Sequence, residues 1–178
     1  MVRSQVRLVW SVVIAAVMVT GCQSVGDGPA NPKAVAPVAL VAQGTGPAGD
    51  YRVWAFHTSD GWACIQVASM GGEDGICNPA GGPPIGGGLT RNAQGVIVDG
   101  ITAEASAVTA VVRDANGATT AIPLIEVGPT LPGVKIAIAN LGPGAKPVAV
   151  DFLDAGGSTV GSAEFPDVPL AGGAGTNP

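Results

Sequence analysis

Hydrophobic and polar side chains alternate one by one along several short segments of the chain. The clearest of these segments are residues 107–113, 134–139 and 148–153. Because successive side chains of an extended strand point to opposite faces, a period of two predicts β-strands with one apolar face. Further short strands, rich in apolar and β-branched residues, are predicted at 38–43, 51–58, 62–69, 95–101, 119–122, 124–127 and 159–165.

Turn signals separate these segments. Asp60-Gly61, Asn116-Gly117 and Gly156-Gly157 each stand between two predicted strands. An Asn-Gly pair favours a two-residue type I′ turn, because both residues tolerate a positive φ. Each signal therefore predicts an antiparallel hairpin, with a type I′ turn at Asn116-Gly117.

Residues 70–88 are rich in glycine and proline and predict a long loop. Their last part, Gly81 to Gly88, lacks the Lys-Ser/Thr ending of a phosphate-binding loop, and no helical pattern follows it. Long loops inside a domain are uncommon and often carry function or are held covalently. We therefore expect residues 64–88 to include a covalently held loop that is a candidate binding element.

Together these patterns predict an all-β fold, an antiparallel β-sandwich of immunoglobulin-like architecture with about eight or nine short strands. The likeness is one of architecture only, because Cys64 and Cys77 are too close in sequence to bridge two sheets as in antibody domains. The strand signals define a domain over residues 37–168. Residues 169–178 are predicted to be a disordered tail.

Composition supports a packed core and excludes several classes of protein. The 178-residue chain has 28 glycines and 15 prolines, but 47% of its residues are hydrophobic. Its 8 basic and 13 acidic residues give a net charge of −5, without a basic cluster, so nucleic acid is excluded as a partner. No apolar run of about 18 residues occurs beyond the N-terminus, so no internal membrane span is expected.

The N-terminal segment has the features of an export signal. Arg3 and Arg7 precede an apolar stretch at 8–19, which is shorter than the roughly 20 residues that a membrane-spanning helix needs. Residues 19–22 then read Val-Thr-Gly-Cys, an aliphatic residue and two small positions before a cysteine. This motif resembles the lipobox of bacterial lipoproteins.

The resemblance implies that residues 1–21 are a signal peptide and that Cys22 becomes an acylated N-terminus. Residues 22–36 would form the lipidated cysteine and a flexible tether, with membrane lipid as the partner of the Cys22 acyl chains. The protein would then be lipid-anchored on the extracytoplasmic face of the cell membrane. An ordinary secretory signal and an uncleaved anchor remain alternatives. The lipobox and, more loosely, the segment from Trp62 to Cys77 resemble small envelope lipoproteins of high-G+C Gram-positive bacteria.

The cysteines support the same compartment. With Cys22 lipidated, Cys64 and Cys77 remain, and an even pair in an exported protein is typical of a disulfide. Closing this loop of about 14 residues would contribute about 3 kcal/mol of stability. A metal site or a redox pair is the alternative, but His57 is the only histidine that could join these thiols as a ligand.

No arrangement of residues has a catalytic signature. His57 would have to serve any Ser-His-Asp triad, but its neighbours Ser59 and Asp60 provide no nucleophile motif. Acids that stand close together in the sequence are expected at solvated turns: Glu73 and Asp74, Asp99 and Glu104, and Asp151 and Asp154. We therefore predict no catalytic residues, no metal site and no cofactor.

The densest aromatic group consists of Trp54, Phe56 and Trp62, which flank one predicted hairpin. Two interpretations stay open. These side chains supply core volume in a protein with few aromatics, or they form an exposed patch that binds a partner. We take the three as candidate binding residues.

The sequence thus predicts a membrane-anchored extracytoplasmic lipoprotein, not an enzyme, that acts as a binding or structural module at the cell envelope. An envelope protein or a wall polymer is the expected partner. Two alternatives remain, a carboxylate-dependent enzyme acting on glycans and a carrier of a small ligand or metal.

Overall fold

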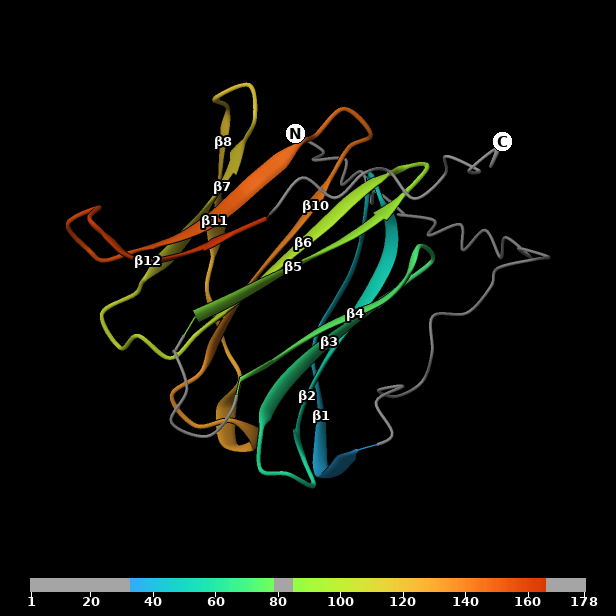
Figure 1. The fold of residues 1–178 in the computed structure, drawn as a ribbon, viewed down its shortest axis with the longest axis vertical. Coiled ribbons are helices and arrows are strands. Elements are labelled where there is room, and N and C mark those ends of the chain that lie inside the picture. The colour runs from blue at the N-terminus through green and yellow to red at the C-terminus, as the bar shows by residue number, and fades with distance from the viewer. Residues whose placement is uncertain (1–32, 79–84, 166–178) are drawn as a thin grey trace, which may run out of the picture.

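The computed structural model describes residues 33–78 and 85–165. Within them the chain forms three four-stranded antiparallel sheets (Figure 1). Sheet A contains, in spatial order, β1 (Ala34–Gly46), β2 (Gly49–Thr58), β3 (Ala63–Ser69) and β4 (Gly72–Asn78). Sheet B contains β5 (Ile85–Asn92), β6 (Gly95–Thr102), β10 (Lys135–Leu141) and β9 (Ile125–Glu126). Sheet C contains β12 (Thr159–Glu164), β11 (Pro147–Leu153), β7 (Thr109–Asp114) and β8 (Thr119–Pro123), and a 3₁₀ turn, η1 (Gly128–Thr130), precedes β10.

Sheet B is the middle layer of the sandwich. Toward sheet A it presents Ile97, Ile101 and Ile136, which join Val53 and Ile65 in one buried cluster. Burying both faces of a sheet requires apolar residues at successive positions, and every residue of β6 is buried. The strand accordingly reads as an unbroken apolar run from residue 96 to residue 98.

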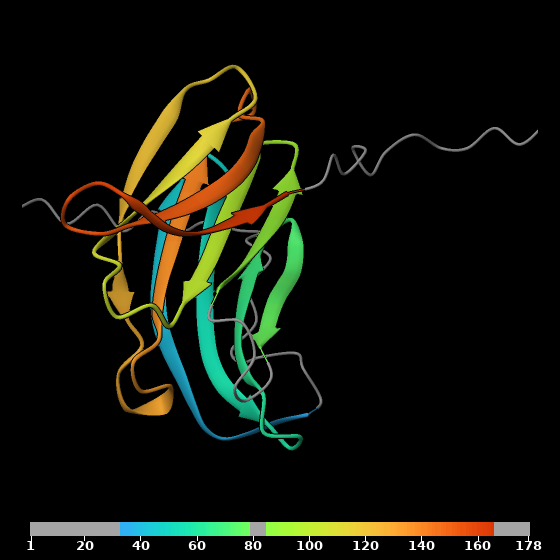
Figure 2. The same ribbon diagram turned by 60° about the vertical axis from the view of Figure 1, so that its left-hand side comes forward.

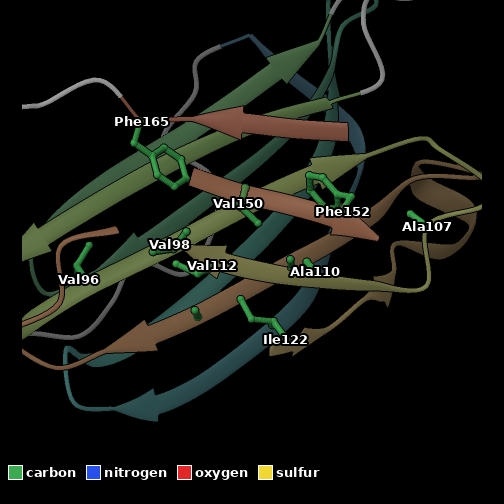
Figure 3. Close-up of a cluster of buried hydrophobic side chains, with 11 residues drawn as sticks. Val96, Val98, Ala107, Ala110, Val112, Ile122, Val150, Phe152 and Phe165 are labelled. Atoms are coloured by element: carbon green, nitrogen blue, oxygen red, sulfur yellow. The ribbon is translucent and has the colours of Figure 1, made fainter. Parts of the chain in front are cut away.

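The opposite face of sheet B packs against sheet C. Val98 of β6 lies in a second cluster with Val112 of β7 and with Val150 and Phe152 of β11 (Figure 3). Phe165, just after β12, closes the end of this cluster. The two clusters together make the core of the protein, one on each side of β6.

The prediction of an all-β antiparallel sandwich is confirmed. The described residues contain more strands than the eight or nine expected, and they form three layers. The additional strands come from the segment predicted as a long loop, residues 70–88. That prediction was wrong, because residues 72–78 form β4 and residues 85–92 form β5. Residues 79–84 lie outside the described part of the chain.

The glycines at the start of β5 explain why this strand was missed. A methyl group at Gly86 would lie 2.7 Å from Cγ2 of Ile76, and one at Gly87 would lie 2.8 Å from Cε1 of Phe165. Glycine within a strand often marks a close approach of neighbouring layers. The run therefore lets β5 lie tightly between β4 on one side and β12 on the other.

The hairpin turns after Asp114 and Asp154 share one geometry. In each, the aspartate accepts a backbone hydrogen bond from a glycine, Gly117 or Gly157, whose φ is +84° or +81°. Asn116 does not have a positive φ, because every described residue with a positive φ is a glycine. The type I′ turn predicted at Asn116-Gly117 was wrong. A three-residue loop ending in a left-handed glycine takes its place.

Two asparagines of sheet B hold the turn between β1 and β2. The side chain of Asn140 accepts a hydrogen bond from the backbone N of Ala48 at 2.6 Å and donates one to the carbonyl of Gly49 at 2.8 Å. Asn92 donates to the carbonyl of Ala48 at 2.8 Å. These bonds join sheets A and B at the end of the molecule opposite the β2–β3 turn (Figure 1).

The sandwich begins slightly earlier than the expected domain start at residue 37. Strand β1 begins at Ala34, within the segment predicted as a tether. The predicted signal peptide, Cys22 and the predicted C-terminal tail lie outside the described residues. Among the residues that are described, no helix is long and apolar enough to cross a membrane.

Candidate functional site

Cys64 and Cys77 form a disulfide between β3 and β4, as predicted. The two residues face each other directly in the antiparallel ladder, with Cα atoms 4.1 Å apart. Paired positions of adjacent strands that do not exchange hydrogen bonds approach this closely, so the ladder itself brings the two thiols together. The bond fixes β4, an edge strand with two glycines, to the centre of sheet A.

The three candidate aromatic residues have different surroundings. Trp54 and Phe56 alternate along β2 with Val53 and Ala55, which face sheet B, so both aromatics lie on the outer face of sheet A. Phe56 is nonetheless buried and Trp54 is half-buried. Trp62, in the turn before β3, is 42% exposed. The structure thus brings Trp54 and Phe56 onto one face but leaves Trp62 as the exposed aromatic side chain of the three.

Exposed apolar side chains also lie along the outer strand β1. Val35, Val38 and Leu40, all in the first half of β1, are about as exposed as Trp62. We call these three residues and Trp62 the apolar edge. Since β1 is an outer strand of sheet A, its first half has a neighbour on one side only among the described strands.

A set of contacts fixes the start of β1 against the β2–β3 turn. The backbone N of Ser59 donates to the carbonyl of Lys33 at 2.8 Å, and the Lys33 ammonium lies 2.6 Å from Oδ2 of Asp60. The hydrogen bond from Lys33 lowers the pKa of Asp60 below its usual value. Figure 1 and Figure 2 both show the start of β1 and this turn at the same end of the molecule. The start of the apolar edge therefore lies where the chain enters the sandwich, and Leu40 lies farther along β1.

The most unusual polar residue was not identified from the sequence. Asp99, expected at a solvated turn, lies in the middle of β6 and is fully buried. That expectation was wrong. Asp99 lies between Ile97 and Ile101 on the face of sheet B that packs against sheet A, and its carboxyl oxygens have no hydrogen-bond partner among the described groups. The unbroken apolar run at residues 96–98, directly before Asp99, was the sequence signal that could have revealed the burial of this residue.

Asp74 of β4 lies next to Asp99. A methyl group at Gly88 of β5 would be 2.9 Å from Oδ1 of Asp99 and 3.0 Å from Oδ2 of Asp74, so the two carboxyl groups meet over this glycine. Asp74 accepts hydrogen bonds from the backbone N of Gly75 at 2.8 Å and of Leu89 at 3.0 Å. Burial raises the pKa of Asp99 to about 7, and the charge of Asp74 adds to the rise. The pair thus combines a carboxyl group that accepts two backbone hydrogen bonds with an acid whose raised pKa favours its protonated form in weakly acidic solution.

Three other acids singled out in the sequence, Glu73, Asp151 and Asp154, have ordinary structural partners. Asp151 lies within β11, not at the turn where it was predicted, and forms an ion pair with Arg113 of β7. The neighbouring acids 73 and 74 point to opposite faces of β4, and Gln66 donates to Glu73 at 2.9 Å. Asp154 accepts bonds from the backbone of its own turn, as predicted.

Within residues 33–78 and 85–165, no group of three or more potential metal-ligating side chains comes together. His57 is on β2, paired with Val35 and Ala63, while Ser59 donates to its neighbour Asp60.

No protein family, curated protein or solved structure matches the chain. Its function therefore has to be argued from its own residues.

Proposed function

We propose that the protein is a lipoprotein, anchored through Cys22 to the outer side of the cell membrane, that acts as a non-catalytic binding or structural module of the envelope. The anchor comes from the lipobox-like residues 19–22 and the preceding apolar stretch. Two or more acyl chains provide stable attachment, since each buried CH₂ contributes about 0.8 kcal/mol.

The observation that carries the extracytoplasmic placement is the disulfide between Cys64 and Cys77. Structural disulfides persist in oxidising compartments and are rare in the reducing cytosol. The bond is also independent of the N-terminal motif, because it lies within the folded domain. The N-terminal motif and the disulfide are therefore two separate observations that both support export of the protein.

The non-catalytic part of the proposal is supported by the surroundings of the one close pair of acids in the described core. Hydrolysis of a glycan by two carboxyl groups requires both to reach the substrate from opposite sides of the scissile bond. Asp99 is fully buried, with Gly88 of β5 against its carboxyl group. A glycan would reach it only if β5 left the sandwich.

The apolar edge and the neighbouring outer face of sheet A are the surface that the proposal assigns to contacts in the envelope. Exposed aromatic and aliphatic side chains on a rigid scaffold are typical of contact surfaces. Here the scaffold is made rigid by the disulfide next to it and by the Lys33–Asp60 pair.

Fractionation of cells that express the full chain tests the anchor. We expect the protein in the membrane fraction, labelled by palmitate, and an uncleaved precursor after treatment with globomycin. Cys22→Ala should abolish the label, whereas the matched variant Cys64→Ala/Cys77→Ala should keep it. Normal cleavage and membrane association of Cys22→Ala would refute the proposal.

A further inference from the structure

The apolar edge contains most of the large hydrophobic side chains that the described residues expose. Four of the six such side chains belong to it, and the other two, Met70 and Val108, lie elsewhere. Three of the four lie on the outer strand β1, and exposed apolar side chains that concentrate on one outer strand are typical of a contact surface. The question is what covers it.

The length of chain before the sandwich limits the answer. Lys33, the first described residue, lies beside the β2–β3 turn, and only residues 23–32 separate it from Cys22. A chain of this length reaches at most about 40 Å even when fully extended. If Cys22 is fixed in the bilayer, the apolar edge stays close to the lipid surface throughout, at a high effective concentration.

We propose that the apolar edge rests on the lipid surface of the membrane that carries the Cys22 acyl chains. The inference rests on the proposed lipid anchor and names the contact made by the same surface. Tryptophan prefers the interface between headgroups and acyl chains, where its ring is apolar and its N–H remains hydrated. Trp62 is the exposed tryptophan of the described residues, and the aliphatic side chains of Val38 and Leu40 would enter the same layer.

The charges at this end of the sandwich permit such a contact. Lys33 and Asp60 neutralise each other in one ion pair beside the apolar edge. The whole protein without residues 1–21 keeps 13 acidic residues but loses two basic ones, Arg3 and Arg7. It is therefore repelled by anionic lipid, and we expect closer contact with zwitterionic lipid.

A second copy of the chain would be another occupant, through strand pairing at the edge. The first half of β1 is poorly suited to it, because the register of β1 against β2 shifts between Val35 and Ala39 and again between Leu40 and Ala42. Pro37, which has no backbone N–H, stands in the same stretch. Bulges and proline on an outer strand discourage pairing with another strand while leaving its side chains exposed.

Quenching of tryptophan fluorescence by lipid tests the contact. The lipoprotein is expressed from its full-length gene with the substitution Trp54→Phe. Because Trp10 is removed with the signal peptide, Trp62 is then the tryptophan that remains. This protein is reconstituted into phosphatidylcholine vesicles. Matched vesicles carry bromine near the carbonyl end of the acyl chains. We expect a blue shift on reconstitution and a loss of Trp62 emission in the brominated vesicles. Equal emission in both vesicles, with the protein floating with the lipid, would overturn the proposal.

Two further variants test the contact and its rivals. Val38→Asp should restore emission in brominated vesicles, whereas Val108→Asp, at a more exposed valine outside the apolar edge, should not. Quenching that is insensitive to Val38→Asp, or cross-linking of two copies through Leu40→Cys, would count against the lipid contact. Protein that fails to float with vesicles refutes the lipid anchor itself, which keeps the two proposals separate.

Discussion

The carboxyl groups of Asp74 and Asp99 meet over Gly88, where a methyl group would lie 3.0 Å from Oδ2 of Asp74 and 2.9 Å from Oδ1 of Asp99. Asp74 is oriented by two backbone N–H groups, whereas Asp99 has none. A buried carboxyl group without hydrogen-bond donors favours its neutral form. The stability of the sandwich should therefore depend on pH through Asp99.

The first prediction concerns Asp99→Asn. The pKa of Asp99 rises from 3.8 to about 7 on folding, so the folded state binds the proton more tightly. The free energy of unfolding should then decrease as the pH rises from 3.8 to about 7 and stay lower above it. This change amounts to at most about 4 kcal/mol. Asparagine cannot ionise, so the variant should lose this dependence and be more stable than the parent above pH 7.

Denaturant unfolding of both proteins on either side of pH 7 measures the difference. Asp74→Asn is the companion variant, because it removes the neighbouring charge but leaves Asp99 buried. It should weaken the pH dependence without abolishing it, since burial is the larger cause of the raised pKa of Asp99. An Asp99→Asn protein with the parent's pH profile would contradict this role of the carboxyl group.

The second prediction concerns the glycine run of β5. Gly87→Ala would place a methyl group 2.8 Å from Phe165 and 2.9 Å from Ala163, so β5 and β12 would have to separate. Overpacking of this kind costs about 1–3 kcal/mol. Gly144→Ala is the control, because no atom lies within 4 Å of the position and its φ is not positive. Thermal unfolding should show a lower midpoint for Gly87→Ala alone, and equal midpoints would mean that β5 does not pack there.

The third prediction concerns the disulfide. Replacing Cys64 and Cys77 together by alanine removes a cross-link over a sequence separation of 13. The chain-entropy estimate is a loss of about 3 kcal/mol in the free energy of unfolding. Denaturant unfolding of the oxidised parent, the reduced parent and the double variant measures it. The reduced parent should behave like the double variant, and a parent unaffected by reductant would show that the thiols are not bonded.

The fourth prediction concerns Asn140, which bonds to the backbone of Ala48 and Gly49. Asn140→Ala leaves one backbone donor and one acceptor of a partly buried turn without partners, at a cost of about 1–3 kcal/mol. Asn116→Ala removes a single bond in an exposed turn and should cost much less. Hydrogen exchange at the Ala48 amide should also accelerate in Asn140→Ala. If exchange there stays slow, the asparagine does not hold the turn.

Much of the fold was predictable because each outer strand has one polar face. The alternation along residues 148–153 identified β11, and Asp60-Gly61 located the hairpin between β2 and β3 correctly. The disulfide was predictable from the number and spacing of the cysteines. These features are local, so a single sequence contains enough information to find them.

The features that were missed depend on contacts between layers. The glycines of β5 look like a loop in the sequence, because the residues that require their small size, such as Phe165 and Ile76, are distant along the chain. Asp99 looked like a turn residue, because the short apolar run at residues 96–98 was the one local sign that β6 is covered on both sides. The candidate aromatics illustrate the same point, because burial of Phe56 and exposure of Trp62 depend on the neighbouring strands.

The central claim is that the protein is a lipoprotein anchored through Cys22. The intact mass of the protein purified from membranes in detergent tests this claim most directly. We predict a single chain that begins at Cys22, increased in mass by a diacylglyceryl group and lacking two hydrogens for the bond between Cys64 and Cys77. A chain that still begins at Met1, or one that contains an unmodified Cys22, would contradict the claim.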